Sequence, residues 1–364
     1  MTTVLIAGGG TGGHLMPALA IAEQLRRDQP AWRIVLAGAE RGIEARLLPE
    51  RHWPFHLLPA EPIYRRQWWK NIRWPGLAWR LIRAVDQVLD TERPAVVLGT
   101  GGYAAGPVVW RAARRGIPTA VLEQDAHPGL TTRWLAGKVR EIYLAVPEAR
   151  TQLSVGDNTD VTVTGAPILP PEPALRAAGL QRFGLDPARP VILVTGGSQG
   201  SLAVNRVVAD WVRSGGAGEF QLLWATGRLT YDQFLDLHHP PHIQVFDFLD
   251  PIQPALAVAD LALTRAGMMT IAELCAWGIP SILVPLPTAA QDHQYRNARV
   301  MAEAGAAVLL PQSELTPSRL GQEVGQLLRD EPRRTRMAAA ALARGRPGAT
   351  AEIARRIARL AGPS

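Results

Sequence analysis

The sequence has a single cysteine, Cys275, and no continuous apolar stretch long enough to cross a bilayer. One cysteine excludes an internal disulfide bond, so the composition gives no support for an oxidising compartment. Glycine, proline, arginine or aspartate interrupts every hydrophobic run before the roughly 20 residues that a transmembrane helix needs. A strand-like run begins at Val4, and we therefore expect no secretory signal ahead of it. These absences predict a protein of the cytoplasm.

Two ligand signatures are missing as well. No two aspartates are separated by one residue, so the Asp-x-Asp metal motif of many nucleotide-sugar enzymes is absent, and no group of cysteines and histidines offers zinc ligands. No glycine-rich loop ends in the lysine that a nucleoside triphosphatase uses. We expect no metal site and no required cofactor, with the charge of any phosphate neutralised by backbone amides and side chains.

The composition and charge are those of a folded protein with an anionic partner. The 47% hydrophobic and 20% charged residues argue against disorder, and 364 residues exceed what one hydrophobic core usually organises. A formal charge of +7 predicts attraction to nucleic acid, acidic lipid or a phosphorylated small molecule. Charge alone does not distinguish these three partners.

Short aliphatic runs alternate with longer helical patterns, and this plan occurs twice along the chain. The alternation is typical of βα units, so it predicts two doubly wound α/β domains with parallel sheets. A proline-rich stretch at 165–173 separates the two series, and the tail at 350–360 has the apolar spacing of a helix. The expected strands are 4–7, 33–37, 95–98 and 119–122 in the first series, and 191–194, 221–226, 242–246, 261–264 and 282–284 in the second.

Three glycine-rich segments, 8–13, 99–106 and 196–200, each follow an expected strand. Glycine lets the backbone approach a ligand closely, and the amides of the following helix attract anions. One such loop is compatible with a tight turn and nothing more, but three of them predict phosphate binding.

A nicotinamide-dependent oxidoreductase is an alternative, because Gly8, Gly10 and Gly13 satisfy the spacing of the dinucleotide fingerprint. A dinucleotide site also expects an acidic residue at the end of the second strand. The sequence has Gly38 and Ala39 there, which weakens this alternative.

Glu273 lies early in an expected helix that follows the loop 265–270. A carboxylate in this place can accept hydrogen bonds from both hydroxyls of a ribose, while the amides before it face a diphosphate. The alternative is an acidic residue that only complements the helix dipole. A polar cluster at 291–297 follows another strand end and suits sugar hydroxyls.

His14 stands where the first glycine-rich loop becomes a helix. A neutral imidazole in this place can take a proton from an attacking hydroxyl, which makes His14 the candidate general base. The alternative is a first-turn histidine whose polar atoms are satisfied by the backbone.

Taken together, these segments resemble one family, the bacterial MurG enzymes, which are UDP-N-acetylglucosamine:N-acetylmuramyl-(pentapeptide) pyrophosphoryl-undecaprenol N-acetylglucosamine transferases. The resemblance spans nearly the whole chain and implies the GT-B fold, with two Rossmann-like domains facing across a cleft. It implies an acceptor and membrane-binding domain over 1–164 plus a C-terminal helix at about 350–364, and a UDP-sugar donor domain over 165–349. It rests on motifs at 9–14, 101–107, 123–131, 196–200, 265–273 and 293–298.

The resemblance implies an inverting, metal-independent hexosyltransferase that acts in peptidoglycan synthesis. N-acetylglucosamine would move from UDP-N-acetylglucosamine to the C4 hydroxyl of a lipid-linked N-acetylmuramyl-peptide, converting lipid I to lipid II, with His14 as the base. The implied donor-binding residues are Thr11, Gly12, Gly13, Ser198, Gln199, Leu249, Met268, Met269, Thr270, Glu273, His293 and Gln294, and the implied acceptor-binding residues are Gly101, Gly102, Tyr103, Glu123, Gln124 and Asp125.

The chain departs from the family pattern at four positions. It has Leu122 and Asp125 where the family commonly has histidine and asparagine, and Ala166 and Leu169 where the family commonly has asparagine and arginine. A diverged GT-B relative with another acceptor, or with no activity, is therefore an alternative.

Tryptophans alternate with cations between residues 62 and 80. Tryptophan prefers the interface between water and lipid, and cations are attracted to anionic headgroups, although a buried helix or a nucleic-acid site can use the same mixture. A lipid-linked acceptor favours a peripheral protein at the cytoplasmic face of the plasma membrane, with anionic lipid and other cell-wall synthesis proteins as partners and no nucleic acid. The residues expected at the membrane are Arg65, Arg66, Trp68, Trp69, Lys70 and Arg73.

Overall fold

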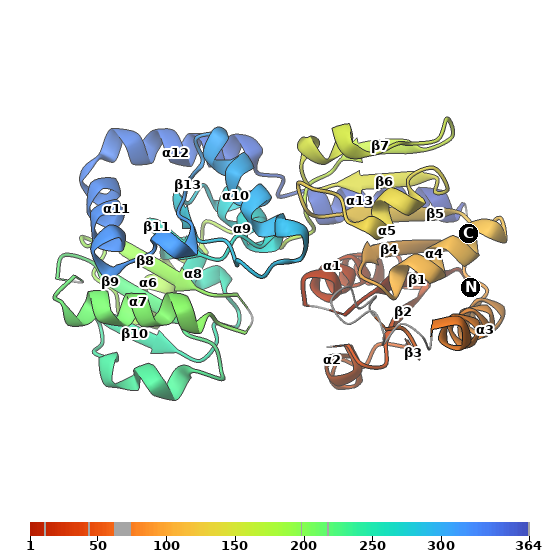
Figure 1. Ribbon diagram of the computed structural model, residues 1–364, viewed down its shortest axis with the longest axis horizontal. Helices are drawn as coiled ribbons and strands as arrows, with labels where there is room; N and C mark the ends of the chain where they lie inside the picture. The colour runs from red at the N-terminus through yellow and green to blue at the C-terminus, as the bar shows by residue number, and fades with distance from the viewer. Residues whose placement is uncertain (11, 43, 62–73, 198, 217, 363–364) are drawn as a thin grey trace. The chain divides into compact units, whose positions relative to one another are not determined.

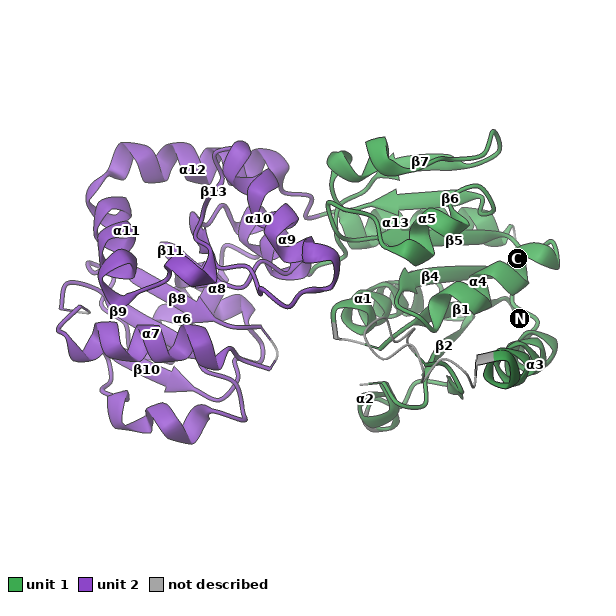
Figure 2. Ribbon diagram, in the orientation of Figure 1, with its two compact units in different colours: residues 1–168, 348–364 green, residues 169–347 purple. Residues whose placement is uncertain are grey.

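The computed structural model describes the chain except for residues 11, 43, 62–73, 198, 217 and 363–364 (Figure 1). The chain divides into two compact units, which are coloured separately in Figure 2. Unit 1 comprises Met1–Ile168 and Gly348–Ser364, and unit 2 comprises Leu169–Pro347. The division lies within the proline-rich stretch at 165–173.

Unit 1 is built on a seven-stranded parallel sheet whose strand order is β3-β2-β1-β4-β5-β6-β7. The first strand lies inside the sheet, and the chain builds outward first to one side and then to the other. This is the order of a doubly wound, Rossmann-like domain. The strands are β1 (Thr3–Gly8), β2 (Arg33–Ala39), β3 (Phe55–Leu58), β4 (Val96–Gly101), β5 (Thr119–Glu123), β6 (Glu141–Leu144) and β7 (Asp160–Val163).

Helices cover both faces of this sheet, as an all-parallel sheet requires. Apolar residues of α3, α4 and α5 pack on one face, and those of α1 and α13 pack on the other. β1 and β2 are buried along almost their whole length because they face a core on each side. The helices are α1 (Gly12–Asp28), α2 (Glu44–Glu50), α3 (Trp74–Glu92), α4 (Ala105–Arg114), α5 (Leu130–Leu135) and α13 (Ala349–Ala361).

Unit 2 repeats the plan with a six-stranded parallel sheet in the order β10-β9-β8-β11-β12-β13. Residues of α7, α11 and α12 form the core over one face of this sheet. The strands are β8 (Val191–Thr195), β9 (Gln221–Ala225), β10 (Ile243–Phe246), β11 (Leu261–Thr264), β12 (Ser281–Leu283) and β13 (Ala307–Leu309). The helices are α6 (Leu175–Phe183), α7 (Leu202–Arg213), α8 (Gln253–Val258), α9 (Met268–Trp277), α10 (His293–Glu303), α11 (Pro317–Arg329) and α12 (Glu331–Arg344).

The predicted doubly wound α/β class is confirmed, and every strand expected from the sequence is present. The ends agree within two residues except at β4, which extends three residues beyond the expected 98. The prediction omitted β3, β6, β7 and β13. These strands have three or four residues each.

The C-terminal helix α13 belongs to unit 1, although the whole of unit 2 precedes it in the chain. Ile353 and Ile357 are fully buried in the same core as α1. Arg356 forms ion pairs with Glu141 of β6 at 3.1 Å and with Asp160 of β7 at 3.2 Å. The helix therefore closes one face of the first sheet and ties two of its outer strands together.

In the described part of the chain, no helix combines the length and the apolar character that crossing a membrane requires.

Replacing Ile357 by alanine is expected to lower the free energy of unfolding by about 2 to 5 kcal/mol, because the change leaves a cavity in a filled core. Urea denaturation followed by tryptophan fluorescence measures this effect. Arg355 lies on the same helix but is exposed, so Arg355→Ala is a matched control whose effect should stay within about 0.5 kcal/mol. Equal effects of the two substitutions would contradict the packing of α13 on unit 1.

Candidate active site

Each sheet has one place where neighbouring strands lead their chains away in opposite directions. In unit 1 this place lies between β1 and β4, and in unit 2 between β8 and β11. Ligands of doubly wound folds bind beyond the carboxyl ends of the strands at such a position, because the diverging connections leave a crevice there. All three glycine-rich segments follow one of these four strands, so the topology gathers them at the two ligand-binding positions.

In unit 2 the crevice is bordered by the loop after β8 and the amino end of α9. Gly267 is the N-cap of α9 and offers no side chain to the helix amides, and the space beside its α-carbon is open. The amides of Met268, Met269 and Thr270 form the first turn of this helix. An uncapped helix amino end attracts anions through its free amides and its dipole. This geometry suits a diphosphate.

Arg265 fixes the loop between β11 and α9. Its guanidinium donates to Ser201 Oγ at 2.8 Å, to Gln312 Oε1 at 2.6 Å, and to the carbonyl oxygens of Val284 and Pro285 at 3.1 and 3.0 Å. These acceptors come from the loops after β8, β12 and β13, and all of them are neutral. Burial lowers the pKa of Arg265 from its ordinary value. The loop therefore holds a buried positive charge at the edge of the sheet where an anion is expected.

Glu273 lies one turn after the amino end of α9. It is half-buried, and within the described part of the chain it makes no hydrogen bond or ion pair. Burial raises the pKa of its carboxyl group to about 7. Thr270 and Glu273 share one face of α9 because they are three positions apart. The carboxylate is thus available to accept hydrogen bonds from a ligand. An acidic residue that only complements the helix dipole would not need to be available in this way.

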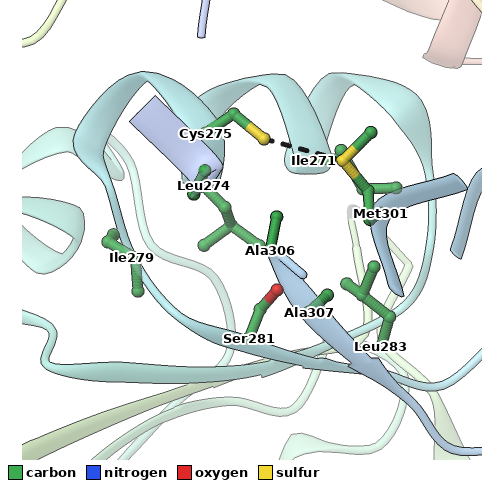
Figure 3. Close-up of a pocket in the computed structure, with 10 residues that line it drawn as sticks. Ile271, Leu274, Cys275, Ile279, Ser281, Leu283, Met301, Ala306 and Ala307 are labelled. Carbon is green, nitrogen blue, oxygen red and sulfur yellow. Dashed lines mark hydrogen bonds between the residues drawn. The ribbon is translucent and has the colours of Figure 1, made fainter. Parts of the chain in front are cut away.

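The opposite face of α9 is fixed by tight apolar packing (Figure 3). Ile271, Leu274 and Cys275 of this helix line a cavity of about 10 Å³ together with residues of β12, α10 and β13. Cys275 Sγ lies 3.8 Å from Met301 Sδ. The cavity holds at most one water molecule, so it is a packing defect and not a binding site. The buried face keeps α9, and Glu273 with it, in place.

The polar cluster after β12 borders the same edge of the second sheet. Gln294 Oε1 accepts a hydrogen bond from Leu286 N at 3.0 Å, which orients the side chain and leaves its amide nitrogen as the group that donates to a ligand. His293 Nδ1 lies 2.8 Å from the carbonyl oxygen of Ala290. Asn297 donates to Ala266 O at 3.3 Å and joins α10 to the loop before α9. Leu249, in the loop after β10, is a buried residue.

In unit 1 the loops after β1 and β4 pack directly on each other. Thr100 Oγ1 donates to His14 O at 2.9 Å. A Cβ on Gly101 would lie 2.5 Å from His14 Cδ2, and a Cβ on Gly102 would lie 1.9 Å from Gly9 O. Both glycines have positive φ angles, 103° and 84°. The backbone of the second loop therefore supports the ring of His14, which only glycine allows at this separation.

Glu123 and Gln124 are buried at the end of β5. The carboxylate of Glu123 accepts hydrogen bonds from Asp125 N at 3.0 Å and from Gly129 N at 2.9 Å. Burial raises the pKa of Glu123 to about 7, and the charge of Asp125 acts in the same direction. Gln124 Nε2 donates to Thr100 O at 3.1 Å. These two side chains shape the loop that carries Asp125 and connect it to the loop beside His14.

The first glycine-rich loop differs from the expectation of free phosphate-binding amides. Gly10 N donates to both carboxylate oxygens of Glu44, at 2.9 and 3.0 Å. Glu44 is fully buried, and nothing in the local sequence indicated a role for it. The Gly10 amide is therefore already bonded to an internal carboxylate, and phosphate binding by the rest of this loop remains a prediction.

The remaining predicted site residues are distributed over both units. Gly12 and Gly13 lie in the first turn of α1, Tyr103 lies against Gly10, and Gln199 is exposed in the loop after β8. The predicted donor residues thus come from unit 1 and unit 2. Thr11, Ser198 and the membrane residues Arg65, Arg66, Trp68, Trp69, Lys70 and Arg73 lie outside the described residues.

No group of three histidine, cysteine, aspartate or glutamate side chains within the described residues is arranged to hold a metal ion. At the positions that depart from the family pattern, Leu122 and Ala166 are buried, whereas Leu169 is 50% exposed. Asp125 keeps a polar group in the position of the asparagine.

The chain matches two domain families along its length. Residues 4–144 match the glycosyltransferase family 28 N-terminal domain, and residues 191–354 match the glycosyltransferase family 28 C-terminal domain. These segments contain the loops of unit 1 and unit 2 described above.

Curated relatives cover nearly the whole chain. A protein of Moorella thermoacetica is 39% identical over 96% of this chain and 96% of its own length, and one of Desulforamulus reducens is 37% identical with the same coverage. Each is named UDP-N-acetylglucosamine--N-acetylmuramyl-(pentapeptide) pyrophosphoryl-undecaprenol N-acetylglucosamine transferase. The crystal structure of Acinetobacter baumannii MurG superposes with a TM-score of 0.77 at 27% identity, covering 98% of this chain and 99% of that one.

Proposed function

The chain belongs to glycosyltransferase family 28, and within it to the MurG family, and from this premise we propose how its residues carry out the transfer. The activity is the transfer of N-acetylglucosamine from UDP-N-acetylglucosamine to a lipid-linked N-acetylmuramyl-pentapeptide, a step of peptidoglycan synthesis. The observation that carries the donor assignment is the uncapped amino end of α9, one turn before the carboxylate of Glu273, which has no partner among the described residues. The matches to family 28 and to the named relatives do not favour a nicotinamide-dependent oxidoreductase or a transferase with a different acceptor.

We propose that unit 2 is the donor domain. The amides of Met268, Met269 and Thr270 would hold the diphosphate together with the loop that contains Ser198 and Gln199, and Glu273 would accept hydrogen bonds from the ribose hydroxyls. Leu249 would meet the uracil through its backbone, and Gln294, with His293, the sugar hydroxyls. The buried cation of Arg265 supports the same loop, so we propose that the leaving diphosphate is stabilised by the protein without a metal.

We propose that unit 1, including α13, is the acceptor domain. The acceptor C4 hydroxyl would attack the anomeric carbon of N-acetylglucosamine as the bond to the diphosphate breaks, which inverts the configuration and gives a β-1,4 linkage. His14 would take the hydroxyl proton, and Thr11, Gly12 and Gly13 beside it would border the sugar. The loops with Gly101 to Tyr103 and Glu123 to Asp125 lie next to His14 within this unit and would hold the acceptor.

We also propose that unit 1 binds the cytoplasmic face of the plasma membrane as a peripheral protein. Helix α4 contacts both α3 and α5, and α3 and α5 each carry an exposed tryptophan with a cation close to its ring. Trp79 is 61% exposed with the Arg83 guanidinium 4.7 Å from its ring centre, and Trp134 is 46% exposed with Lys138 Nζ at 5.4 Å. Tryptophan next to cations suits an anionic lipid surface, and a lipid-linked acceptor requires one.

The assigned activity and base are tested together by turnover of UDP-N-acetylglucosamine with a soluble analogue of the lipid acceptor. The unsubstituted enzyme should release UDP and form the disaccharide product. His14→Ala should lower kcat by roughly a hundredfold or more with UDP affinity nearly unchanged, because a general base contributes to the chemical step.

His52 is an exposed histidine of the same unit, and asparagine tolerates its positive φ of 54°, so His52→Asn is the matched control. This control should keep full turnover. Full turnover in His14→Ala would show that another group takes the proton. Glu123 and Asp125 are the next candidates for the general base.

Glu273→Ala should weaken donor binding by about 1 to 3 kcal/mol, because two ribose hydroxyls lose a charged acceptor. The pKa of about 7 adds a pH dependence. Ribose hydroxyls donate to the ionised carboxylate, so affinity should rise as pH rises through 7, by about tenfold from pH 6 to pH 8. Calorimetry should use UDP-N-acetylglucosamine, since its diphosphate is esterified at both ends and does not titrate in this range.

Glu273→Gln should abolish this pH dependence, whereas Glu303→Gln, which changes a 67% exposed carboxylate of the same unit, should preserve it. An unchanged donor affinity in Glu273→Ala would rule out the ribose assignment.

Binding to vesicles that contain anionic lipid should weaken as salt is added, because part of the attraction is electrostatic. It should fall further in the double variant of Trp68 and Trp69 to alanine, and also in the double variant of Trp79 and Trp134 to alanine. Tyr295→Ala changes a 37% exposed aromatic residue of unit 2 and should leave binding unchanged. Equal binding by all variants, or no binding at low salt, would contradict the proposed membrane surface.

A further inference from the structure

The carboxylate of Glu44 lies inside the first glycine-rich loop, although its chain position is the start of α2. Its Oε1 accepts hydrogen bonds from Gly10 N at 2.9 Å and from Ala39 N at 2.7 Å, and its Oε2 lies 3.0 Å from Gly10 N. The residue is fully buried. One side chain therefore connects the loop after β1 with the end of β2, and Glu44 lies 34 positions from Gly10 in the sequence.

Three glycines leave the space that this carboxylate occupies. A Cβ on Gly9 would lie 1.9 Å from Glu44 Oε1, one on Gly38 would lie 2.4 Å from its Cγ, and one on Gly42 would lie 2.3 Å from its Cδ. A real side chain does not tolerate such separations, so glycine at these positions is explained by the carboxylate. Glycine at position 9 of this loop therefore has a cause within the protein and does not need a phosphate to explain it.

The same loop carries the side of the site that holds His14. A Cβ on Gly10 would lie 2.5 Å from Tyr103 Cε1, and Gly9 O packs on Gly102. The loop is thus held between Glu44 on one side and the loop after β4 on the other. His14, in the first turn of α1, follows directly from it.

We propose that Glu44 is the internal hydrogen-bond acceptor of the first glycine-rich loop and a positioning residue for the reaction. In other glycine-rich βα loops, backbone amides of this kind face a phosphate. Here the carboxylate takes that place, fixes the loop that leads into α1, and so sets the position of His14. The diphosphate of the acceptor must then be bound by groups other than the Gly10 amide. The positional role in catalysis rests on the proposed function, whereas the occupation of the loop by Glu44 does not.

Three variants of the full-length protein test the proposal. Glu44→Ala removes the acceptor of both amides, Glu44→Asp shortens its reach, and Glu44→Gln keeps an amide oxygen that can occupy the Oε1 position and accept from Gly10 N and Ala39 N. Glu40→Ala is the matched control, because Glu40 is an exposed carboxylate at the end of the same strand.

The first readout is hydrogen exchange at the amides of Gly10 and Ala39, measured on the protein without substrate. Exchange should accelerate at least tenfold in Glu44→Ala and Glu44→Asp, and remain close to that of the unsubstituted protein in Glu44→Gln and Glu40→Ala. Unchanged exchange in Glu44→Ala would overturn the proposal whatever reaction the protein catalyses.

The second readout is turnover with UDP-N-acetylglucosamine and the soluble acceptor analogue. Glu44→Ala should lower kcat by roughly tenfold to a hundredfold with UDP affinity within twofold, and Glu44→Gln should recover most of the activity. Full kcat in Glu44→Ala, or UDP affinity lost in parallel with kcat, would contradict a positional role confined to unit 1. If Glu44→Ala does not fold, faster turnover by Glu44→Asp than by Glu44→Gln would contradict it as well. Absence of turnover in the unsubstituted protein would instead refute the proposed function and leave the exchange result standing.

Discussion

A parallel sheet whose chain begins in the middle must send two neighbouring connections in opposite directions, and both units of this protein obey that constraint. β1 and β4 diverge in the first sheet, and β8 and β11 diverge in the second. The carboxyl ends of these strands are where loops can present backbone amides without clashing with a covering helix. The glycine-rich loops, His14 and Glu273 all lie next to these four strand ends. The strand order therefore decides where these groups are placed, and the individual side chains decide what they bind.

The two crevices use this opening differently. In unit 2 the amino end of α9 has no side-chain cap, and a neutral set of acceptors holds the buried cation Arg265 beneath it. The potential there favours an anion. In unit 1 the corresponding loop already contains the carboxylate of Glu44. The first crevice is therefore suited to hold a sugar hydroxyl beside a histidine, and the second to hold a nucleotide diphosphate. This is the division that we propose between an acceptor unit and a donor unit.

The sequence was sufficient to predict the doubly wound class, most of the long strands and the helical start that carries Glu273, because these follow from local periodicity and glycine spacing. The role of Glu44 was not predictable, since its partner lies 34 positions away and its own surroundings resemble any helix start. The hydrogen bonds of Arg265 reach Ser201 and Gln312, 64 and 47 positions away. The pKa values of Glu123 and Glu273 depend on burial, which is set by tertiary packing. The tryptophan-rich segment around Trp68 remains a prediction, because it lies outside the described residues.

Hydrogen exchange with and without UDP tests most directly whether the second crevice is the donor site. UDP should slow exchange at the amides of Met268 to Thr270 and in the loop 196–201, while the loop 8–10 and the segment 99–103 keep the exchange rates of the free protein. Protection of the loops of unit 1 alone, or no protection at the first turn of α9, would contradict the assignment of nucleotide binding to unit 2.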